Sequence, residues 1–414
     1  MVDHQSPTSY IPPRRSERWI EIVGVFTRLG FTAFGGPVAH VALMEDELVR
    51  RRQWCSRQEF WDAVSAIHFI PGPNSTELAI HMGFIRGGYV GLVLAGVCFI
   101  TPAVLIILPL AFLYVRYGSL PQVQPVLQTV SAALIAIIAG VCFRLIRTCL
   151  HNRLTIGVAI LTLGLLLTRQ MGLPVFADLF DRFQPEVLIL GIAAGMGILW
   201  QFRSLSAGSI LVPAPLLLKA PSPIHSDPSW IPMILFFLKV GATLFGSGYV
   251  LISFLQSGLV EKYGWINSQQ LTDAITVGQF TPGPLLTTAT FLGYLLGHST
   301  FGAGDVGGFV GAILATVAIF TPSFVLVALL APRFDSLRQQ GWVRSALDAM
   351  NASVLVLIGY SLYTMSSTVL RFQGNWDLLN ALIVVVGIGL IVSSKINATW
   401  LILIAGVLGL SRLG

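Results

Sequence analysis

The chain is built from long apolar runs separated by short polar segments, and most of these runs have the length of a membrane-spanning helix. A helix needs about 20 apolar residues to cross a hydrocarbon core of about 30 Å. The run 309–330, for example, contains no charged residue. The pattern predicts spans near 89–115, 126–145, 154–167, 187–200, 306–330, 345–365, 378–392 and 398–410.

Two further apolar segments near the start of the chain are interrupted by glycine and proline. The segment 19–37 ends in Phe34-Gly35-Gly36-Pro37, and 60–70 is stopped by Pro71-Gly72-Pro73. Neither motif can continue a regular helix. The residues 74–76 are helix-capping types, so a new helix is expected to begin directly after Pro-Gly-Pro and to run to about Gly87. Between the two breaks, 40–58 is amphipathic and charged, and we expect it at the membrane interface with Trp54 as an aromatic anchor.

The region around these breaks occurs twice. Residues 26–73 align with 237–284 without a gap at a spacing of 211, and 15 of 48 positions are identical, where chance gives about 3. Beyond a nine-residue insertion near His298 the spacing becomes 220. A duplicated unit of this kind predicts a repeat architecture. We therefore divide the chain into a polar tail 1–18, a first repeat 19–202, a Pro-rich linker 203–230 and a second repeat 231–414.

The fold class follows as an all-α polytopic membrane protein with two homologous repeats and about 10–12 spans in total. If each Pro-Gly-Pro segment crosses the membrane, the repeats are parallel; if it folds back as two half-helices, each repeat has an odd number of spans and the second is inverted. Lys and Arg collect on the cytoplasmic side of membrane proteins. Their distribution favours inverted repeats here, although this arrangement leaves Arg14, Arg15 and Arg18 outside.

Composition supports a membrane protein and excludes other classes. The chain is 54% apolar and 11% charged, with a mean hydropathy of +0.77, whereas soluble domains carry about 25% charged residues. The net charge of +6 comes from basic residues scattered in short loops. This distribution is typical of loop cations beside a membrane and does not indicate nucleic-acid binding. The four cysteines have no metal-binding spacing and are interpreted as apolar fillers. The partner predicted by composition is the lipid bilayer.

A cation lies inside an apolar helix at the same position of each repeat. Arg28 and Lys239 are 211 residues apart, and a cation at mid-helix costs about 2.5–3.5 kcal/mol on insertion scales. One such residue can snorkel to the interface or pair with a carboxylate. Because both repeats carry it, we interpret the pair as binding an anionic substrate.

The broken helices point to the same chemistry. A helix that begins after Pro-Gly-Pro presents unpaired N–H groups and a partial positive charge at its N-terminus. Two such termini near the membrane midplane would form an oxyanion site, with hydroxyls and amides as further donors. The alternative is that the prolines only kink transmembrane helices. Besides the two cations, the candidate substrate-binding residues are Thr32, Gly35, Gly36, Pro71, Gly72, Pro73, Asn74, Ser75, Thr76, Thr243, Pro282, Gly283, Pro284 and Thr287.

The motifs together resemble the chromate ion transporter family in its long, two-domain form. They are Phe31-Thr32-Ala33-Phe34-Gly35-Gly36-Pro37 with His40, then Trp54, Phe60 and Pro71-Gly72-Pro73, then Gly83 and Phe99-Ile100-Thr101-Pro102. The resemblance covers nearly the whole chain. It implies a multi-pass transporter of the bacterial inner membrane that exports chromate, gives chromate resistance and is energised by the proton-motive force, with sulfate as a structural analogue of the substrate. The second repeat departs from the pattern, since Gly36-Pro37 becomes Ser247-Gly248 and His40 becomes Leu251.

Candidate coupling residues are Glu77, His40, His68, Asp62 and Asp273. Glu77 lies one turn into the helix after Pro-Gly-Pro, where a carboxylate either compensates the helix N-terminus or carries a proton beside the anion. The two aspartates are equivalent across the repeats, and their alternative roles are pairing with Arg57 or capping a half-helix.

Other functions remain as alternatives to chromate export. A carrier of sulfate or another oxyanion, and an uncoupled anion channel, would share this architecture. No catalytic motif, metal-ligand spacing or cofactor motif is present, so we expect neither an enzyme nor a metal site nor a cofactor. The sequence leaves the oligomeric state open, a homodimer included.

Overall fold

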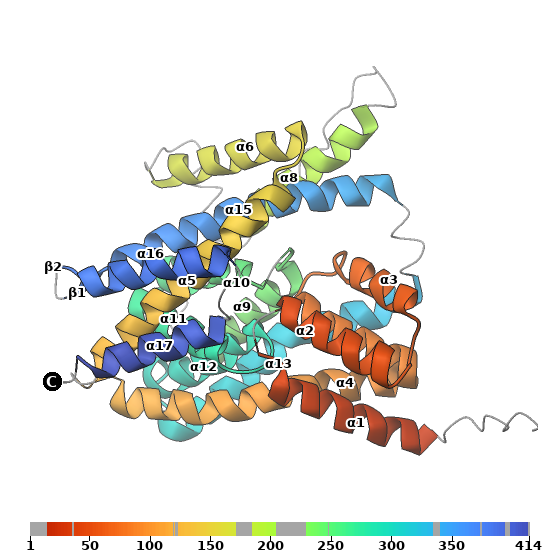
Figure 1. The fold of residues 1–414 in the computed structure, drawn as a ribbon, viewed down its shortest axis with the longest axis horizontal. Helices are drawn as coiled ribbons and strands as arrows, with labels where there is room; N and C mark the ends of the chain where they lie inside the picture. Colours follow the sequence, from red (N-terminus) through yellow and green to blue (C-terminus); the bar gives the residue numbers. More distant parts are fainter. Residues whose placement is uncertain are drawn as a thin grey trace, which may run out of the picture.

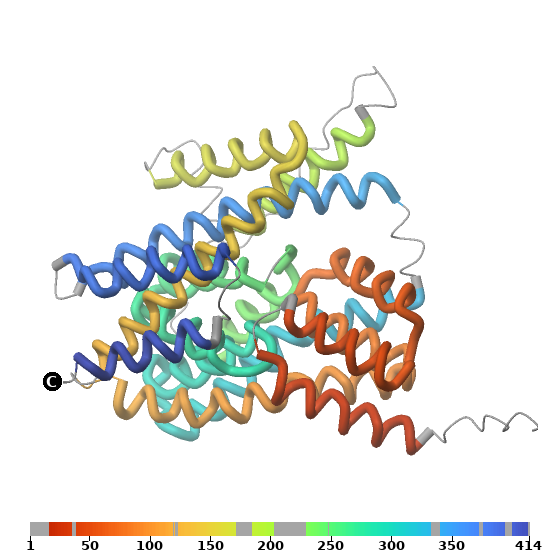
Figure 2. Tube along the Cα trace, viewed as in Figure 1, coloured from red at the N-terminus to blue at the C-terminus, as the bar shows by residue number. Residues whose placement is uncertain are grey.

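The structure is a computed structural model that describes residues 15–412 apart from 35–36, 119, 121–122, 171–183, 204–228, 247, 334–339, 373–374 and 394–397. Its described residues are almost entirely helical (Figures 1 and 2). The helices of the first repeat are α1 (Arg15–Thr32), α2 (Pro37–Met44), the π-helix η1 (Glu45–Arg51), α3 (Arg57–Ile67), α4 (Asn74–Tyr117), α5 (Val123–Cys149), α6 (Arg153–Gln170) and α8 (Pro185–Arg203).

The second repeat contains the same elements in the same order. They are α9 (Trp230–Thr243), α10 (Val250–Leu255), the π-helix η2 (Gln256–Lys262), α11 (Ser268–Phe280), η3 (Leu285–Thr287), α12 (Thr288–Leu295), η4 (Leu296–Thr300), α13 (Gly304–Leu330), η5 (Ala331–Arg333), α15 (Gly341–Val369), α16 (Leu378–Val392) and α17 (Ala398–Leu410). A short antiparallel pair, β1 (Arg371–Phe372) and β2 (Asn375–Trp376), precedes α16.

Even the irregular features of the two repeats match. The π-helices η1 and η2 occupy equivalent residues, and both are followed by a left-handed residue, Gln53 (φ 52°) or Gly264 (φ 61°). Capping boxes then start α3 and α11, with Ser56 and Asn267 as the equivalent N-caps. The duplication read from the sequence is therefore a duplication of three-dimensional structure.

Helix α4 is a hairpin of two arms rather than one straight rod. At 44 residues a straight helix would be about 66 Å long, twice the thickness of a hydrocarbon core. Gly88 breaks it with φ 65° and ψ −153°. The arms approach so closely that a side chain on Gly83 would collide with the Gly91 carbonyl. The predicted helix 74–87 and the predicted span 89–115 are these two arms, and α12–η4 with α13 forms the equivalent hairpin of the second repeat.

Equivalent helices of the two repeats pack against each other in opposite directions. At one end of the α5–α15 pair, Gln128 donates hydrogen bonds to the carbonyls of Val369 (3.2 Å) and Arg371 (2.8 Å). At the other end, His151 lies 3.8 Å from Asp348. The start of α5 therefore meets the end of α15, and the reverse.

The pair α4–α13 behaves in the same way. Gly96 of α4 packs against Phe324 of α13, and the cluster that contains Leu92 also contains Val327. Helices that are equivalent, membrane-spanning and antiparallel are related by a two-fold axis that lies in the membrane plane. The repeats are therefore inverted, as the distribution of Lys and Arg predicts.

Six described helices have the length and apolar character of membrane spans: α4, α5, α6, α8, α13 and α15. Three shorter apolar helices, α9, α16 and α17, accompany them. In Figure 1, α6, α8, α15 and α16 lie above the second repeat's α9–α13, α5 runs diagonally from them to the lower left, and α1 lies at the lower right. The largest hydrophobic core is centred on α9–α13 and α15, and a second core joins α1 to α4.

Two expectations about the polar segments need comment. The predicted linker 203–230 lies almost wholly outside the described residues, while α1 begins at Arg15 and so includes the last residues of the predicted tail. Trp54 was expected as an anchor at the membrane interface. Its indole N–H donates to the half-buried Glu21 carboxylate (3.0 Å), a partner that the amphipathic pattern does not show. Its place at the membrane interface stays a prediction.

Candidate functional site

Each Pro-Gly-Pro segment is hydrogen-bonded to the broken helix of the opposite repeat. The Gly72 N–H donates to the Leu244 carbonyl (2.7 Å), and the Gly283 N–H donates to the Ala33 carbonyl (3.1 Å). The two glycines are equivalent, and so are the two carbonyls, which directly follow the ends of α1 and α9. We call these two contacts the reciprocal glycine bonds. They join the repeats at the pseudo-two-fold axis.

A small enclosed space, the central cavity, lies at this crossing. Its volume is about 20 Å³, enough for about one water molecule. It is lined by the starts of both interrupted helices, through Ser75 and Leu285, and by the first broken end through Ala33. Tyr249 and Thr281 add hydroxyl groups. The two helix N-termini that the sequence predicts to converge do meet, around a space with room for about one water molecule.

The backbone geometry makes these helix starts suitable for an anion. Helix α4 begins at Asn74 and η3 at Leu285, directly after the two Pro-Gly-Pro segments. The first N–H groups of a helix lack partners within it, and the helix dipole places partial positive charge there. Two such ends at one cavity favour an acceptor-rich ligand with negative charge.

His40 lines the same cavity and supports one reciprocal bond. Its Nε2–H donates to the Ala33 carbonyl (2.9 Å), which also accepts from Gly283. The ring is 2% exposed and packs edge-on against Phe99. Among the described residues no partner is found for Nδ1. The second repeat has Leu251 at this position, so its carbonyl lacks such support.

Glu77 forms a buried polar contact between the repeats. Its Oε1 accepts a hydrogen bond from Ser323 of α13, while no described residue pairs with Oε2. The equivalent positions in the other repeat are Thr288 and Ala103. A carboxyl–hydroxyl pair therefore packs beneath Gly72, where the second repeat has threonine and alanine.

The remaining neutral candidates separate into two groups. Thr32 and Thr243 donate to the carbonyls four residues earlier, at 2.9 and 2.8 Å, on exposed helix surface. Thr287 donates to the Pro284 carbonyl (2.6 Å), and Thr76 is fully buried. Thr32 and Thr243 are thus engaged with their own helices, away from the central cavity.

Asn74 connects two predicted residues to the second repeat. Its side-chain amide donates to His68 (2.9 Å) and approaches the Gly246 carbonyl (3.4 Å). His68 itself is exposed, so this predicted coupling residue sits at the edge of the crossing. The predicted Gly35 and Gly36 lie outside the described residues.

The two helix cations do not line the central cavity. Arg28 is 61% exposed and lies 3.9 Å from Glu47. Lys239 is also exposed, and the charges nearest to it are those of Lys262 and Glu186. The structure brings neither cation to the meeting point of the helix starts.

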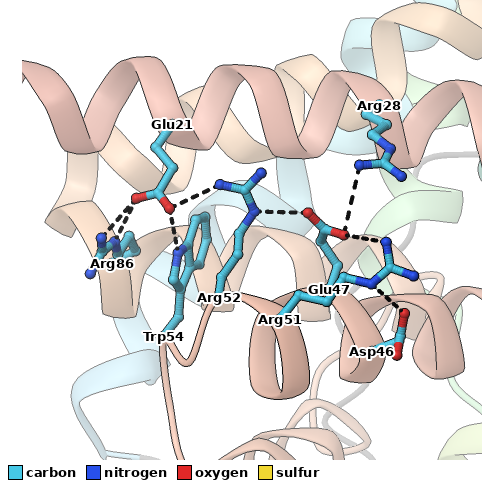
Figure 3. Close-up of polar contacts among 8 residues, drawn as sticks. All are labelled: Glu21, Arg28, Asp46, Glu47, Arg51, Arg52, Trp54 and Arg86. Atoms are coloured by element: carbon cyan, nitrogen blue, oxygen red, sulfur yellow. Dashed lines mark hydrogen bonds and ion pairs between the residues drawn. The ribbon is translucent and has the colours of Figure 1, made fainter.

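Arg28 is instead the end of a network that we call the ion-pair ladder (Figure 3). Glu21 of α1 accepts from Arg86 (2.7 Å), Arg52 (3.0 Å) and Trp54. The ladder comprises Glu21, Arg28, Asp46, Glu47, Arg51, Arg52, Trp54 and Arg86. It ties α1 to η1 and to the α4 hairpin.

Glu47 is the second acidic centre of the ladder. It accepts from Arg52 (2.8 Å) and lies 3.8 Å from Arg51 and 3.9 Å from Arg28. In the second repeat the positions of Arg52 and Trp54 are held by Tyr263 and Trp265, whose rings stack at 4.5 Å. Glu21, Arg52 and Arg86 did not stand out in the sequence, because they are scattered in it and have no counterparts in the second repeat.

The two equivalent aspartates differ in their surroundings. Asp273 is 3% exposed; it accepts from the Tyr114 hydroxyl (2.8 Å) and from Gln269 (2.9 Å). Asp62 is half-buried. Within the described ranges no group of three or more His, Cys, Asp or Glu side chains could hold a metal ion.

A search with protein-family models matches this chain twice. The model described as "Chromate transporter" covers residues 20–198 and 231–410. This chain belongs to the chromate transporter family. Each match covers one repeat, so one family unit corresponds to one of the two inverted repeats of the structure.

Several curated relatives align along most of the chain. The chromate transport protein of Cupriavidus metallidurans is 32% identical, covering 91% of this chain and 88% of the relative. A probable chromate transport protein of Synechococcus elongatus is also 32% identical, with 83% and 86% covered. An uncharacterized transporter of Methanocaldococcus jannaschii is 28% identical, with 96% and 95% covered. No solved structure matches the chain significantly.

Proposed function

We propose that this protein is a secondary active transporter that exports chromate across the bacterial inner membrane and thereby gives chromate resistance. Sulfate, a tetrahedral oxyanion with the same charge, is the natural competitor. The relatives named as chromate transport proteins support the substrate. The observation that supports the mechanism is the central cavity, where two helix N-termini and both broken helices meet on the pseudo-two-fold axis.

Inverted repeats explain how such a site can face each side in turn. If the two repeats exchange conformations, the same central cavity opens to opposite faces of the membrane. The reciprocal glycine bonds are the contacts that must break and re-form in each exchange. A cavity of about 20 Å³ holds about one water, so an oxyanion enters only when the repeats separate. This favours a carrier over an open channel.

The candidate residues then take distinct roles. The backbone of the Pro-Gly-Pro segments, Ser75 and Thr287 surround the oxyanion, and Glu77 and His40 adjust the charge beside it. Arg28 and Lys239 act outside the cavity, one toward each face, where they attract the anion. None of these roles is catalytic.

The test is chromate flux into everted membrane vesicles, comparing wild type with Pro73→Ala and Pro109→Ala. Pro73 ends the segment before α4, whereas Pro109 lies inside an α4 arm that stays helical around it. We expect energy-dependent accumulation that sulfate inhibits. Pro73→Ala should reduce it by about ten-fold, equivalent to about 1.4 kcal/mol, while Pro109→Ala stays near wild type.

Two outcomes would contradict the proposal. Absence of accumulation with the wild-type protein present in the vesicles would reject chromate export. Equal losses in the two proline variants would reduce Pro-Gly-Pro to an ordinary kink, and the anion site would have to lie elsewhere.

A further inference from the structure

A second and much larger space, which we call the chamber, lies at the other end of α11. Its volume is about 490 Å³, room for about 15 water molecules at about 30 Å³ each. It is lined by the starts of α5 and α11 and by the end of α4. Its lining is rich in amide and hydroxyl side chains, among them Gln124, Gln128, Asn267, Gln270, Ser299 and Thr368.

The charged groups of the chamber lie at different depths. Among the described lining residues the ionisable groups are Tyr114 on α4, Asp273 on α11 and Arg371 on β1. The lining positions of α5, η4 and α15 carry none. Arg371 is exposed, whereas Asp273 is 3% exposed. An incoming anion therefore meets a guanidinium first and a carboxyl group last.

Two ion pairs lie close to the chamber without lining it. Arg116, two residues after Tyr114, is 3.8 Å from Asp305, which is also 3.4 Å from His298. Because these charges are mutually compensated, the field inside the chamber is set mainly by Arg371 and Asp273.

Helix α11 connects the chamber to the central cavity. Gln269, Asp273 and Thr276 follow each other on one face of the helix, and Thr276 is 3.3 Å from the Ser131 hydroxyl of α5. One turn further on, Gly278 and Gln279 line the central cavity. Asp273 and Gln279 are six residues apart, or about 9 Å along the helix. Helix α11 therefore runs from one space to the other, with Thr276 as the polar side chain between Asp273 and Gln279.

The equivalent place at the other end of the molecule is built differently. Gln128 and Arg371 correspond to Asp348 and His151, which form an ion pair at 3.8 Å. Tyr114 corresponds to phenylalanine in the sequence, so the tyrosine that donates to Asp273 is not repeated there. The combination of Arg371, Tyr114 and Asp273 is therefore not repeated at the equivalent sequence positions.

We propose that the chamber is the aqueous approach by which a divalent oxyanion reaches the central cavity from one face of the membrane, and that Asp273 is its charge gate. This inference rests on the proposed function. Ionised Asp273 repels a dianion strongly in a site shielded from bulk water. Protonated by water in the chamber, it becomes neutral, and the anion passes along α11. Tyr114, which donates to Asp273 across the repeat boundary, positions the carboxyl group.

The first experiment tests the chamber itself and needs no transport. In a variant without Cys55, Cys98, Cys142 and Cys149, cysteine is introduced as Gln124→Cys or Thr368→Cys and treated with a membrane-impermeant thiol reagent. Both positions should label from one face only. Val385→Cys, on an exposed apolar face of α16, should resist labelling. Failure of both chamber positions to label from either face would show that the chamber is not aqueous and would overturn the inference.

Sulfate, which unlike chromate does not oxidise thiols, then serves as the probe anion. At about ten times its dissociation constant it should slow labelling about ten-fold, since about nine-tenths of the protein is occupied. Labelling that sulfate leaves unchanged would show that the anion takes another route. Either result is obtained even if the protein fails to accumulate chromate, so the two proposals fail separately.

The second experiment compares Asp273→Asn with the matched variant Asp62→Asn. Wild-type flux should fall as pH rises and Asp273 ionises. Asp273→Asn should flatten this dependence, whereas Asp62→Asn should retain it. Tyr114→Phe should move the midpoint of the profile without removing its slope, which a merely structural loss of folded protein would not do. Parallel pH profiles for wild type and Asp273→Asn would overturn the charge gate.

Discussion

At the residue scale, the two Pro-Gly-Pro glycines share a backbone conformation but have different neighbours. Gly72 has φ +142° and Gly283 has φ +109°, values that strongly favour glycine. A side chain on Gly72 would collide with the Glu77 carboxyl group and lie 2.6 Å from the Ser323 hydroxyl. A side chain on Gly283 would meet the Ala103 methyl group at 2.9 Å. The first position therefore has the more polar and the more crowded surroundings.

We predict that Gly72→Ala destabilises the protein more than Gly283→Ala and abolishes transport. Backbone strain costs about 1–3 kcal/mol at such positions, and at Gly72 the displaced Glu77–Ser323 contact adds to it. Gly88→Ala is the matched control, since its φ is +65° and its added methyl group meets nothing within 4 Å. Thermal unfolding in detergent and vesicle flux measure the effect. Equal losses in all three variants would show that strain alone, and not the crossing, matters.

The sequence identified the residues of the crossing through duplication and chemistry but not their partners. Pro-Gly-Pro stands out because both repeats contain it. Glu77 and His40 stand out because only the first repeat contains them. That the Gly72 N–H binds the Leu244 carbonyl depends on how two repeats dock, and no local pattern encodes it. For the same reason the sequence does not show that Arg28 and Lys239 are exposed. Each apolar helix has an exposed side, and the sequence does not tell which side faces outward.

At the scale of elements, the ion-pair ladder holds α1, η1 and the α4 hairpin as one unit. Arg86 lies two residues before the Gly88 break and also stacks over Trp54 at 5.3 Å. The ladder spans helices that contribute Ala33 to the central cavity and Ser75 to its opposite wall. If the first repeat moves as one rigid body, these helices must be firmly attached to one another.

Removing Glu21 should therefore loosen the first repeat. Glu21→Ala leaves Arg52, Arg86 and Trp54 without their shared acceptor, and we expect a loss of about 1–3 kcal/mol. Glu45→Ala is the control: it breaks the pair with Arg57 (3.1 Å), whose side chain is 73% exposed, so about 0–1 kcal/mol is expected. The melting temperatures of the two variants measure these two losses of stability. If both lose the same stability, the ladder is no more than surface charge.

Element boundaries were largely predictable, because glycine, proline and capping residues interrupt long apolar runs. The predicted spans 345–365 and 378–392 fall within α15 and α16, and the break after 87 falls at Gly88. The π-helices were not predictable. An extra residue per turn leaves no distinct signature in a segment where charged residues already obscure the apolar period.

At the scale of the whole molecule, symmetry and asymmetry serve different purposes. The pseudo-two-fold axis gives two equivalent helix starts, two reciprocal glycine bonds and two antiparallel helix pairs. The charged features break this symmetry. The position equivalent to Glu77 is a threonine, the position equivalent to Arg371 is His151, and aromatic residues take the place of part of the ladder. A symmetric frame allows exchange between two orientations, while the unequal charges make its two ends electrostatically different.

The inverted arrangement itself can be tested with one pair of cysteines. Gln53 and Gly264 are equivalent, exposed and both left-handed in backbone conformation, so they occupy the same position in the two repeats. In the variant without native cysteines, Gln53→Cys and Gly264→Cys should label with an impermeant thiol reagent from opposite faces of oriented vesicles. Gly264→Cys introduces strain of about 1–2 kcal/mol, which a folded membrane protein tolerates. Labelling from the same face would require parallel repeats and would contradict the antiparallel packing of α5 with α15, on which the alternating exposure of the central cavity depends.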